Sequence, residues 1–146
     1  MKRLLLMTIL VVCFVGVTFH PGCKTDNPNS NSDLLFNIKW VLESIHYSTL
    51  NIVSIQDTFS ILFRQNGSMD LEVDCNTCSG TFELGNNGAI TIIDHSLCTE
   101  ADCGPDSRDA EFHTALDGVT RYEIDGNNLR LFFTNGQSRL NFTKSN

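Results

Sequence analysis

The chain has 146 residues, of which 41% are hydrophobic and 18% are charged, and this length suits one domain. Its formal net charge of −7 argues against a nucleic-acid binder, because phosphate contacts need clustered Lys and Arg. With only 3 Pro and 10 Gly, the composition excludes collagen-like and low-complexity chains.

The N-terminus has the shape of a secretory signal. Two basic residues precede an apolar run over residues 4–19, which is shorter than the roughly 20 residues that a membrane-crossing helix needs. Gly22 and Cys23 follow, and a small residue directly before Cys resembles a bacterial lipobox. We therefore expect a signal peptide over residues 1–22 and lipidation of Cys23. Ordinary secretion and an uncleaved anchor are the alternatives.

Residues 24–33 read KTDNPNSNSD, a polar stretch that we interpret as a flexible tether. Removal of the signal takes away two basic residues and no acidic one, so the formal charge falls from −7 to −9. An anionic membrane surface repels such a body, so lipid on Cys23 is expected to supply the attachment. The predicted organisation is a signal peptide (1–22), a lipidated Cys with its tether (23–33) and one folded domain (34–146).

Apolar residues alternate with polar ones over most of the folded part, a period of two that predicts antiparallel strands with one buried face. We expect about eight strands; the clearest lie at 59–63, 69–73, 82–84, 89–93, 121–125, 129–133 and 140–142. Asn66-Gly67 and Asn135-Gly136 are predicted to form two-residue hairpin turns. The expected fold class is therefore mostly β, a highly curved and partly closed barrel-like sheet.

One segment has a helical period instead. Phe112, Ala115, Leu116 and Val119 repeat at intervals of three and four, and Gly118 is a suitable end. The spacing predicts one helix over about 107–117, between the fifth and sixth strands. We expect it to plug an open end or cover one face of the sheet.

The chemically most specific cluster is four cysteines, Cys75, Cys78, Cys98 and Cys103. They fit two structural disulfides in an exported chain, a four-cysteine zinc site, or a redox dithiol at Cys75 and Cys78. Five acidic residues lie close to them in sequence, and negative neighbours disfavour the thiolate that zinc and redox sites need. We therefore favour disulfides.

Several fragments occur in one order: WVLESI over 40–45, CNTCSGTF over 75–82, TEADC over 99–103, EFHTAL over 111–116 and YEIDGNNLRL over 122–131. Together they resemble the META/HslJ-like domain family over about 39–143. The resemblance implies a small envelope or secreted β domain with stress associations and no established enzyme activity. The family pattern includes Cys75 and Cys103, so it implies that these two pair, which leaves Cys78 with Cys98.

The remaining functional expectations are modest. No catalytic motif is present, so we expect a non-enzymatic envelope lipoprotein that acts as an interaction or stress-tolerance module, without cofactor or metal. Its expected partners are the membrane, through the lipid, and an envelope protein, with the chain itself a monomer. A binder of a small apolar ligand in a β cavity and a Cys-based metal-binding protein are the alternatives. Trp40 is expected in the core, His95 and His113 in solvent, and Glu111 beside Arg121 or Arg130.

Overall fold

The computed structural model describes residues 32–55 and 58–145. The predicted signal peptide, Cys23 and all but the last two residues of the predicted tether lie outside the described residues. Within the described part, no helix is long and apolar enough to cross a membrane.

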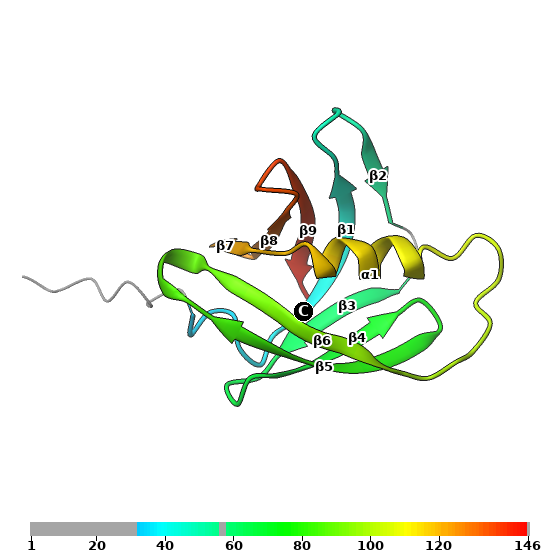
Figure 1. Ribbon diagram of the computed structural model, residues 1–146, viewed down its shortest axis with the longest axis horizontal. Helices are drawn as coiled ribbons and strands as arrows, with labels where there is room; N and C mark the ends of the chain where they lie inside the picture. Colours follow the sequence, from blue (N-terminus) through cyan, green and yellow to red (C-terminus); the bar gives the residue numbers. More distant parts are fainter. Residues whose placement is uncertain (1–31, 56–57, 146) are drawn as a thin grey trace, which may run out of the picture.

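The described fold is one antiparallel sheet that curls into a half-barrel, with a single α-helix (Figure 1). The strands follow the order β6-β5-β4-β3-β1-β9-β8-β7, and β2 pairs with β1 outside this path. Their bounds are β1 Lys39–His46, β2 Ile52–Ser54, β3 Phe59–Phe63, β4 Ser68–Val73, β5 Asn76–Leu84, β6 Ile90–Cys98, β7 Arg121–Asp125, β8 Asn128–Phe133 and β9 Ser138–Lys144. A short 3-10 turn, η1, covers Asn86–Gly88, and α1 covers Asp109–Asp117.

The predicted fold class is confirmed, with a correction to the position of the helix. Helix α1 lies between β6 and β7, whereas the sequence placed it between the fifth and sixth strands. The difference arises from β2, which has only three residues and too few alternations to be recognised as a strand.

Strand β1 shows how the alternating pattern can be interrupted. Trp40 and Leu42 are buried, but the next buried residue is Ile45 and not Ser44. The pairing of β1 with β9 shifts between Leu42 and Ser44, and such a bulge moves the following residues to the opposite face. The indole Nε1 of Trp40 donates a hydrogen bond to the Leu35 carbonyl (3.1 Å), which confirms its place in the core.

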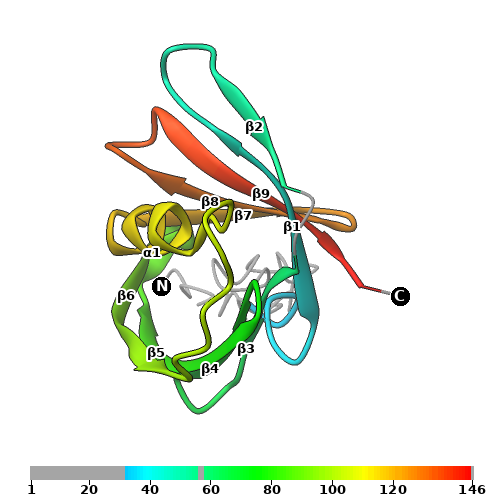
Figure 2. The same ribbon diagram turned by 90° about the vertical axis from the view of Figure 1, so that its right-hand side faces the viewer.

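Helix α1 lies beside β6 and β7, the two end strands of the sheet, and covers the open side of the curled sheet (Figure 2). Its buried face consists of Phe112, Ala115 and Leu116, and the Phe112 ring meets the Phe59 ring edge-on with centroids 5.2 Å apart. The helix begins at Asp109, two residues later than predicted, and it ends at Asp117 as predicted, with Gly118 as its C-cap.

Both predicted two-residue turns are wrong. After β3 the chain makes a four-residue turn, in which the Gly67 N–H donates to the Arg64 carbonyl (3.1 Å) and only Gly67 has a positive φ, 82°. Phe133 and Ser138 likewise pair across a four-residue loop. Within the described residues, two-residue turns instead join β4 to β5, where Val73 pairs with Asn76, and β7 to β8, where Asp125 pairs with Asn128.

Candidate functional site

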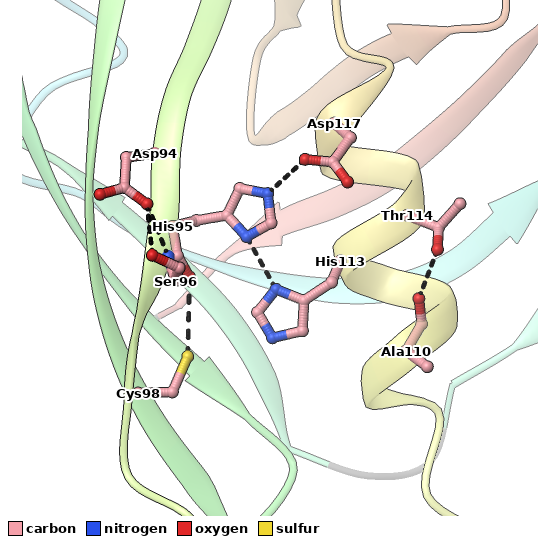
Figure 3. Close-up of polar contacts among 8 residues, drawn as sticks. All are labelled: Asp94, His95, Ser96, Cys98, Ala110, His113, Thr114 and Asp117. Atoms are coloured by element: carbon pink, nitrogen blue, oxygen red, sulfur yellow. Dashed lines mark hydrogen bonds and ion pairs between the residues drawn. The ribbon is translucent and has the colours of Figure 1, made fainter.

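The contact between β6 and α1 brings together three polar side chains that the sequence keeps apart. His95 belongs to β6, whereas His113 and Asp117 lie one helical turn apart on α1 and so share a face. His95 Nδ1 is 2.8 Å from His113 Nδ1, and His95 Nε2 is 2.8 Å from Asp117 Oδ1 (Figure 3). The two imidazole rings stack with centroids 4.9 Å apart.

These distances determine where the protons lie when both imidazoles are neutral. The Asp117 carboxylate can only accept, so His95 Nε2–H donates to it and His95 Nδ1 is left as an acceptor. His113 Nδ1–H then donates to His95 Nδ1, and His113 Nε2 keeps its lone pair. Burial lowers the pKa of His113, as does the charge of His95, although Asp109 and Asp117 act in the opposite direction. The neutral form of His113 is therefore favoured.

A disulfide lies next to this histidine pair. Cys78 of β5 and Cys98 of β6 are directly opposite partners in the sheet, and the structure joins them by a disulfide. One imidazole nitrogen of His113 and both sulfur atoms lie within 4.8 Å of one another. Cys78 is buried, with 4% of its surface exposed, and Cys98 is half-buried.

The second disulfide has different surroundings. Cys75 is exposed and bonds to Cys103, and the neighbouring Asn76 side chain holds the returning loop in place. Asn76 Nδ2 donates to the Ala101 carbonyl (3.0 Å), and Asn76 Oδ1 accepts from the Ala101 N–H (2.8 Å) and the Thr99 hydroxyl (2.9 Å). The Cys75-Asn76 fragment and the fragment over residues 99–103 are thus held together by a disulfide and by the hydrogen bonds of Asn76. We call this arrangement the clasp, and its contacts fix the loop in place.

The two disulfides have the pairing that the resemblance implied. Because Cys75 and Cys78 are each bonded to a different partner, the structure contains neither a dithiol of those two residues nor a zinc site made of all four cysteines.

A surface hollow of about 340 Å³ lies beside the Cys78–Cys98 disulfide. Its lining is formed by Val73, Asn76, Cys78, Cys98, Thr99, Glu100, Ala101, Asp102, Asp109 and His113. Three of these residues are acidic and one is the histidine beside the disulfide. The hollow therefore offers a negatively charged rim, which attracts cations, around an imidazole nitrogen and two sulfur atoms.

Other residues singled out in the sequence take different places from those expected. His95 and His113 were predicted to lie in solvent, but the His95 side chain is only 12% exposed and His113 packs against it. Glu111 does not contact Arg121 or Arg130. It accepts hydrogen bonds from the Tyr47 hydroxyl (2.5 Å) and from Arg108 (2.7 Å). One pattern in the sequence could have indicated this cluster. His113 and Asp117 have the i, i+4 spacing that puts them on one helix face. The strand before this helix carries His95 and Cys98.

The comparisons with known proteins agree with this fold. The family model described as "META domain" matches residues 33–146. A solved structure of a protein from Burkholderia xenovorans is 17% identical, covers 86% of this chain and 97% of its own, and superposes with a TM-score of 0.66. A DUF4847 family protein from Bacteroides vulgatus is 16% identical, with 77% and 95% covered and a TM-score of 0.59.

Among curated proteins, none matches this chain significantly. The low identities to the solved structures mean that those likenesses establish the fold alone. The family model, however, matches more than half of the chain, and the Cys75–Cys103 clasp lies within the matched residues. The chain therefore belongs to the META domain family.

Proposed function

We propose that the protein is a non-enzymatic module of a bacterial cell envelope, held to a membrane by lipid on Cys23 and acting in stress tolerance by binding a partner protein. The N-terminal sequence supports the anchor, because a short apolar run leads directly to Gly22 and Cys23. The polar residues that follow supply a tether long enough to hold the domain away from the membrane surface.

The observation that carries the binding role is the β1–β2 hairpin, which projects beyond the rest of the sheet (Figure 1). Leu50 at its tip is 95% exposed, and Ile52 on β2 is 59% exposed. Leu50 also has a φ of 63°, a left-handed conformation that a bulky side chain rarely adopts and that is often found at functional positions.

The pairing of β2 strengthens this interpretation. Among the described strands β2 pairs only with β1, so its other edge offers unpaired backbone groups next to exposed apolar side chains. Such an edge can accept an extended segment of another protein as an additional strand. The partner class that fits is therefore a protein with an extended apolar segment.

A cavity for an apolar ligand has less support. The interior of the curled sheet is filled by fully buried large side chains, among them Trp40, Phe59, Phe63, Phe112 and Phe142. The hollow beside the Cys78–Cys98 disulfide lies at the surface and has an acidic rim, which does not suit an apolar ligand.

The binding role can be tested by crosslinking in cells. A photoreactive amino acid replaces Leu50 in the full chain, and a matched variant carries it at Asn127, an exposed position in the turn between β7 and β8. The proposal expects a discrete adduct from position 50 that is absent from position 127 and that Ile52→Ser weakens. Absence of an adduct at position 50, or the same adducts from both positions, would contradict it.

The anchor needs a separate measurement. Cys23→Ala should move the protein from the membrane fraction into the soluble fraction without changing its melting temperature, because the residue precedes residues 33–146, which the family model matches. If the variant stays in the membrane fraction, lipid on Cys23 is not what holds the protein.

A further inference from the structure

Cys78, Cys98 and His113 lie close enough together to serve a second function besides the disulfide crosslink. The geometry points to a zinc site that the disulfide keeps closed: after reduction, Cys78 Sγ, Cys98 Sγ and His113 Nε2 bind one Zn²⁺. The three ligand residues come from β5, β6 and α1, and one imidazole nitrogen of His113 and the two sulfur atoms already lie within 4.8 Å of one another. Partner binding at the β1–β2 hairpin plays no part in this inference.

The first step is reduction of the Cys78–Cys98 disulfide, which requires a dithiol as reductant. The dithiol donates two electrons and two protons to the Cys78–Cys98 bond, which breaks to give two thiols while the dithiol becomes a disulfide. Zn²⁺ then replaces the two thiol protons, which pass to solvent. Cys98 lines the open hollow and is half-buried, so a reductant can approach this sulfur from the solvent side.

The spacing of the ligand atoms suits a tetrahedral ion. Zinc binds sulfur at about 2.3 Å and imidazole nitrogen at about 2.0–2.1 Å, which places ligand atoms roughly 3.5–3.8 Å from one another. Because the Cα atoms of Cys78 and Cys98 face each other on adjacent strands, rotation of the two side chains can separate the sulfurs by this amount without moving the sheet. The fourth position faces the hollow, where water completes the coordination.

The neighbouring residues prepare His113 to act as a ligand. Metal-bound histidines usually donate their second ring N–H to a fixed acceptor, which orients the ring. Here His113 Nδ1–H donates to His95, whose own Nε2–H donates to Asp117. This chain leaves the lone pair of His113 Nε2 available, and His113 is one of the residues that line the hollow. Figure 3 shows no contact to this nitrogen among the residues drawn.

The charge around the hollow favours a cation. Glu100, Asp102 and Asp109 line it, and their charges raise the local concentration of divalent ions. The same charges disfavour free thiolates, so the cysteines are expected to lose their protons only as the metal binds.

Cobalt is the probe for the test, because Co²⁺ occupies tetrahedral zinc sites and shows thiolate charge-transfer bands. The full chain carries Cys13→Ser and Cys23→Ser, so that only the four domain cysteines remain. It is reduced with a dithiol, freed of reductant without air and titrated with Co²⁺. We expect one tetrahedral, thiolate-bound Co²⁺ per reduced chain and none per oxidised chain. A reduced chain that binds no Co²⁺ would overturn the proposal.

Variants then identify the ligands. His113→Gln should remove the tetrahedral spectrum. His95→Gln should keep the spectrum but weaken affinity by about tenfold or more, as loss of a supporting hydrogen bond does. His46→Gln, at a histidine that contacts Arg139 elsewhere in the sheet, should change neither. Equal effects of the His46 and His113 substitutions would contradict the assignment.

A second measurement needs no variant of the ligands. The reduced chain is alkylated with and without Zn²⁺, and labelling is measured for each cysteine by peptide mass spectrometry. Zinc should protect Cys78 and Cys98 and leave Cys75 and Cys103 labelled. Protection of Cys75 together with Cys78 would instead indicate a Cys-x-x-Cys site and refute the one proposed.

Discussion

The Tyr47 hydroxyl lies 2.5 Å from Glu111 Oε1, and this hydrogen bond joins the end of β1 to helix α1. It connects residues 64 positions apart, and Arg108 holds the other carboxylate oxygen of Glu111 at 2.7 Å. The helix that covers the open side of the sheet is thus fixed by a polar contact in addition to the packing of Phe112.

Removal of this hydroxyl should destabilise the domain. Tyr47→Phe is expected to lower the free energy of unfolding by about 1–3 kcal/mol, since a partly buried carboxylate loses a donor. Urea unfolding measures the change. Tyr122→Phe is the matched control, because its hydroxyl makes no hydrogen bond within the described residues, and equal losses in the two variants would contradict the role of Tyr47.

The same contact predicts a dependence of stability on pH. Burial alone would raise the pKa of Glu111, but hydrogen bonds from Tyr47 and Arg108 outweigh it and hold the pKa below its ordinary value of 4.5. A carboxyl with a lowered pKa in the folded state contributes stability above 4.5, and this contribution is lost as pH falls through the folded pKa.

Glu111→Gln should therefore reduce stability at neutral pH and flatten its decline in acid. Urea midpoints of the variant and the unmodified protein, measured as pH falls from neutral through 4.5 and below, should converge. Two curves that stay parallel would show that Glu111 does not contribute in this way.

Tyr47 gives stability the opposite dependence on pH, because its contribution is lost as pH rises into the alkaline range. Burial and the hydrogen bond to Glu111 raise the pKa of Tyr47 to about 12 from 10.0. Its contribution is complete below 10.0 and is lost as pH rises towards 12, because only the unfolded chain then ionises. The Tyr47→Phe variant should lose less stability than the unmodified protein over this interval, and a greater loss would refute the assignment.

Asn76 should prove important for stability, with no part in any chemistry. Asn76→Ala removes three hydrogen bonds that fix residues 99 and 101 and is expected to cost about 2–3 kcal/mol of unfolding free energy. The control is Ser79→Ala at an exposed position of the same strand, which should change stability by less than about 0.5 kcal/mol. An unchanged free energy of unfolding for Asn76→Ala would show that the clasp does not stabilise the domain.

Gly80 occupies a position where a side chain has no room. A Cβ atom there would lie 2.2 Å from the Asp94 carbonyl oxygen and 2.6 Å from Met69 Cε. Gly80→Ala should cost about 2–3 kcal/mol, as overpacking does, and should displace His95, whose Cα lies 3.1 Å from the same Cβ. Side-chain NMR signals of His113 report that displacement, and unchanged signals together with unchanged stability would contradict it.

The sequence predicts those structural features that depend on residues close together in the chain, and it misses those that depend on contacts between distant segments. Alternation along a strand and the three-and-four spacing of Phe112, Ala115 and Leu116 are local, so the strands and the helix were predictable. The bulge after Leu42 and the very short β2 are set by the neighbouring strands, and the local pattern does not encode them. The disulfide pairing came from resemblance to a family, because four cysteines alone allow three pairings.

The candidate site was harder to predict because its members meet only after folding. His95 and His113 are separated by a loop and belong to different kinds of element, so each alone resembled an exposed histidine. Their contact depends on α1 crossing the edge of β6, a tertiary arrangement that neither segment specifies by itself.

Reduction should lower the melting temperature substantially. The two disulfides span 28 and 20 residues, and loop closure of this size contributes roughly 3–4 kcal/mol each. Losing both should lower the melting temperature by about 10 °C or more in a domain of this size. Calorimetry with and without a thiol reductant measures this shift. A Cys13→Ser, Cys23→Ser chain is the control, because both residues precede residues 33–146, which the family model matches.

Two disulfides, Cys75–Cys103 and Cys78–Cys98, hold the native domain together. Peptide mapping of the unreduced protein, isolated from cells with free thiols blocked at lysis, tests this pairing most directly. We expect two crosslinked peptide pairs with this connectivity and no blocked thiol among the four cysteines. Four blocked thiols, or a Cys75–Cys78 crosslink, would contradict it.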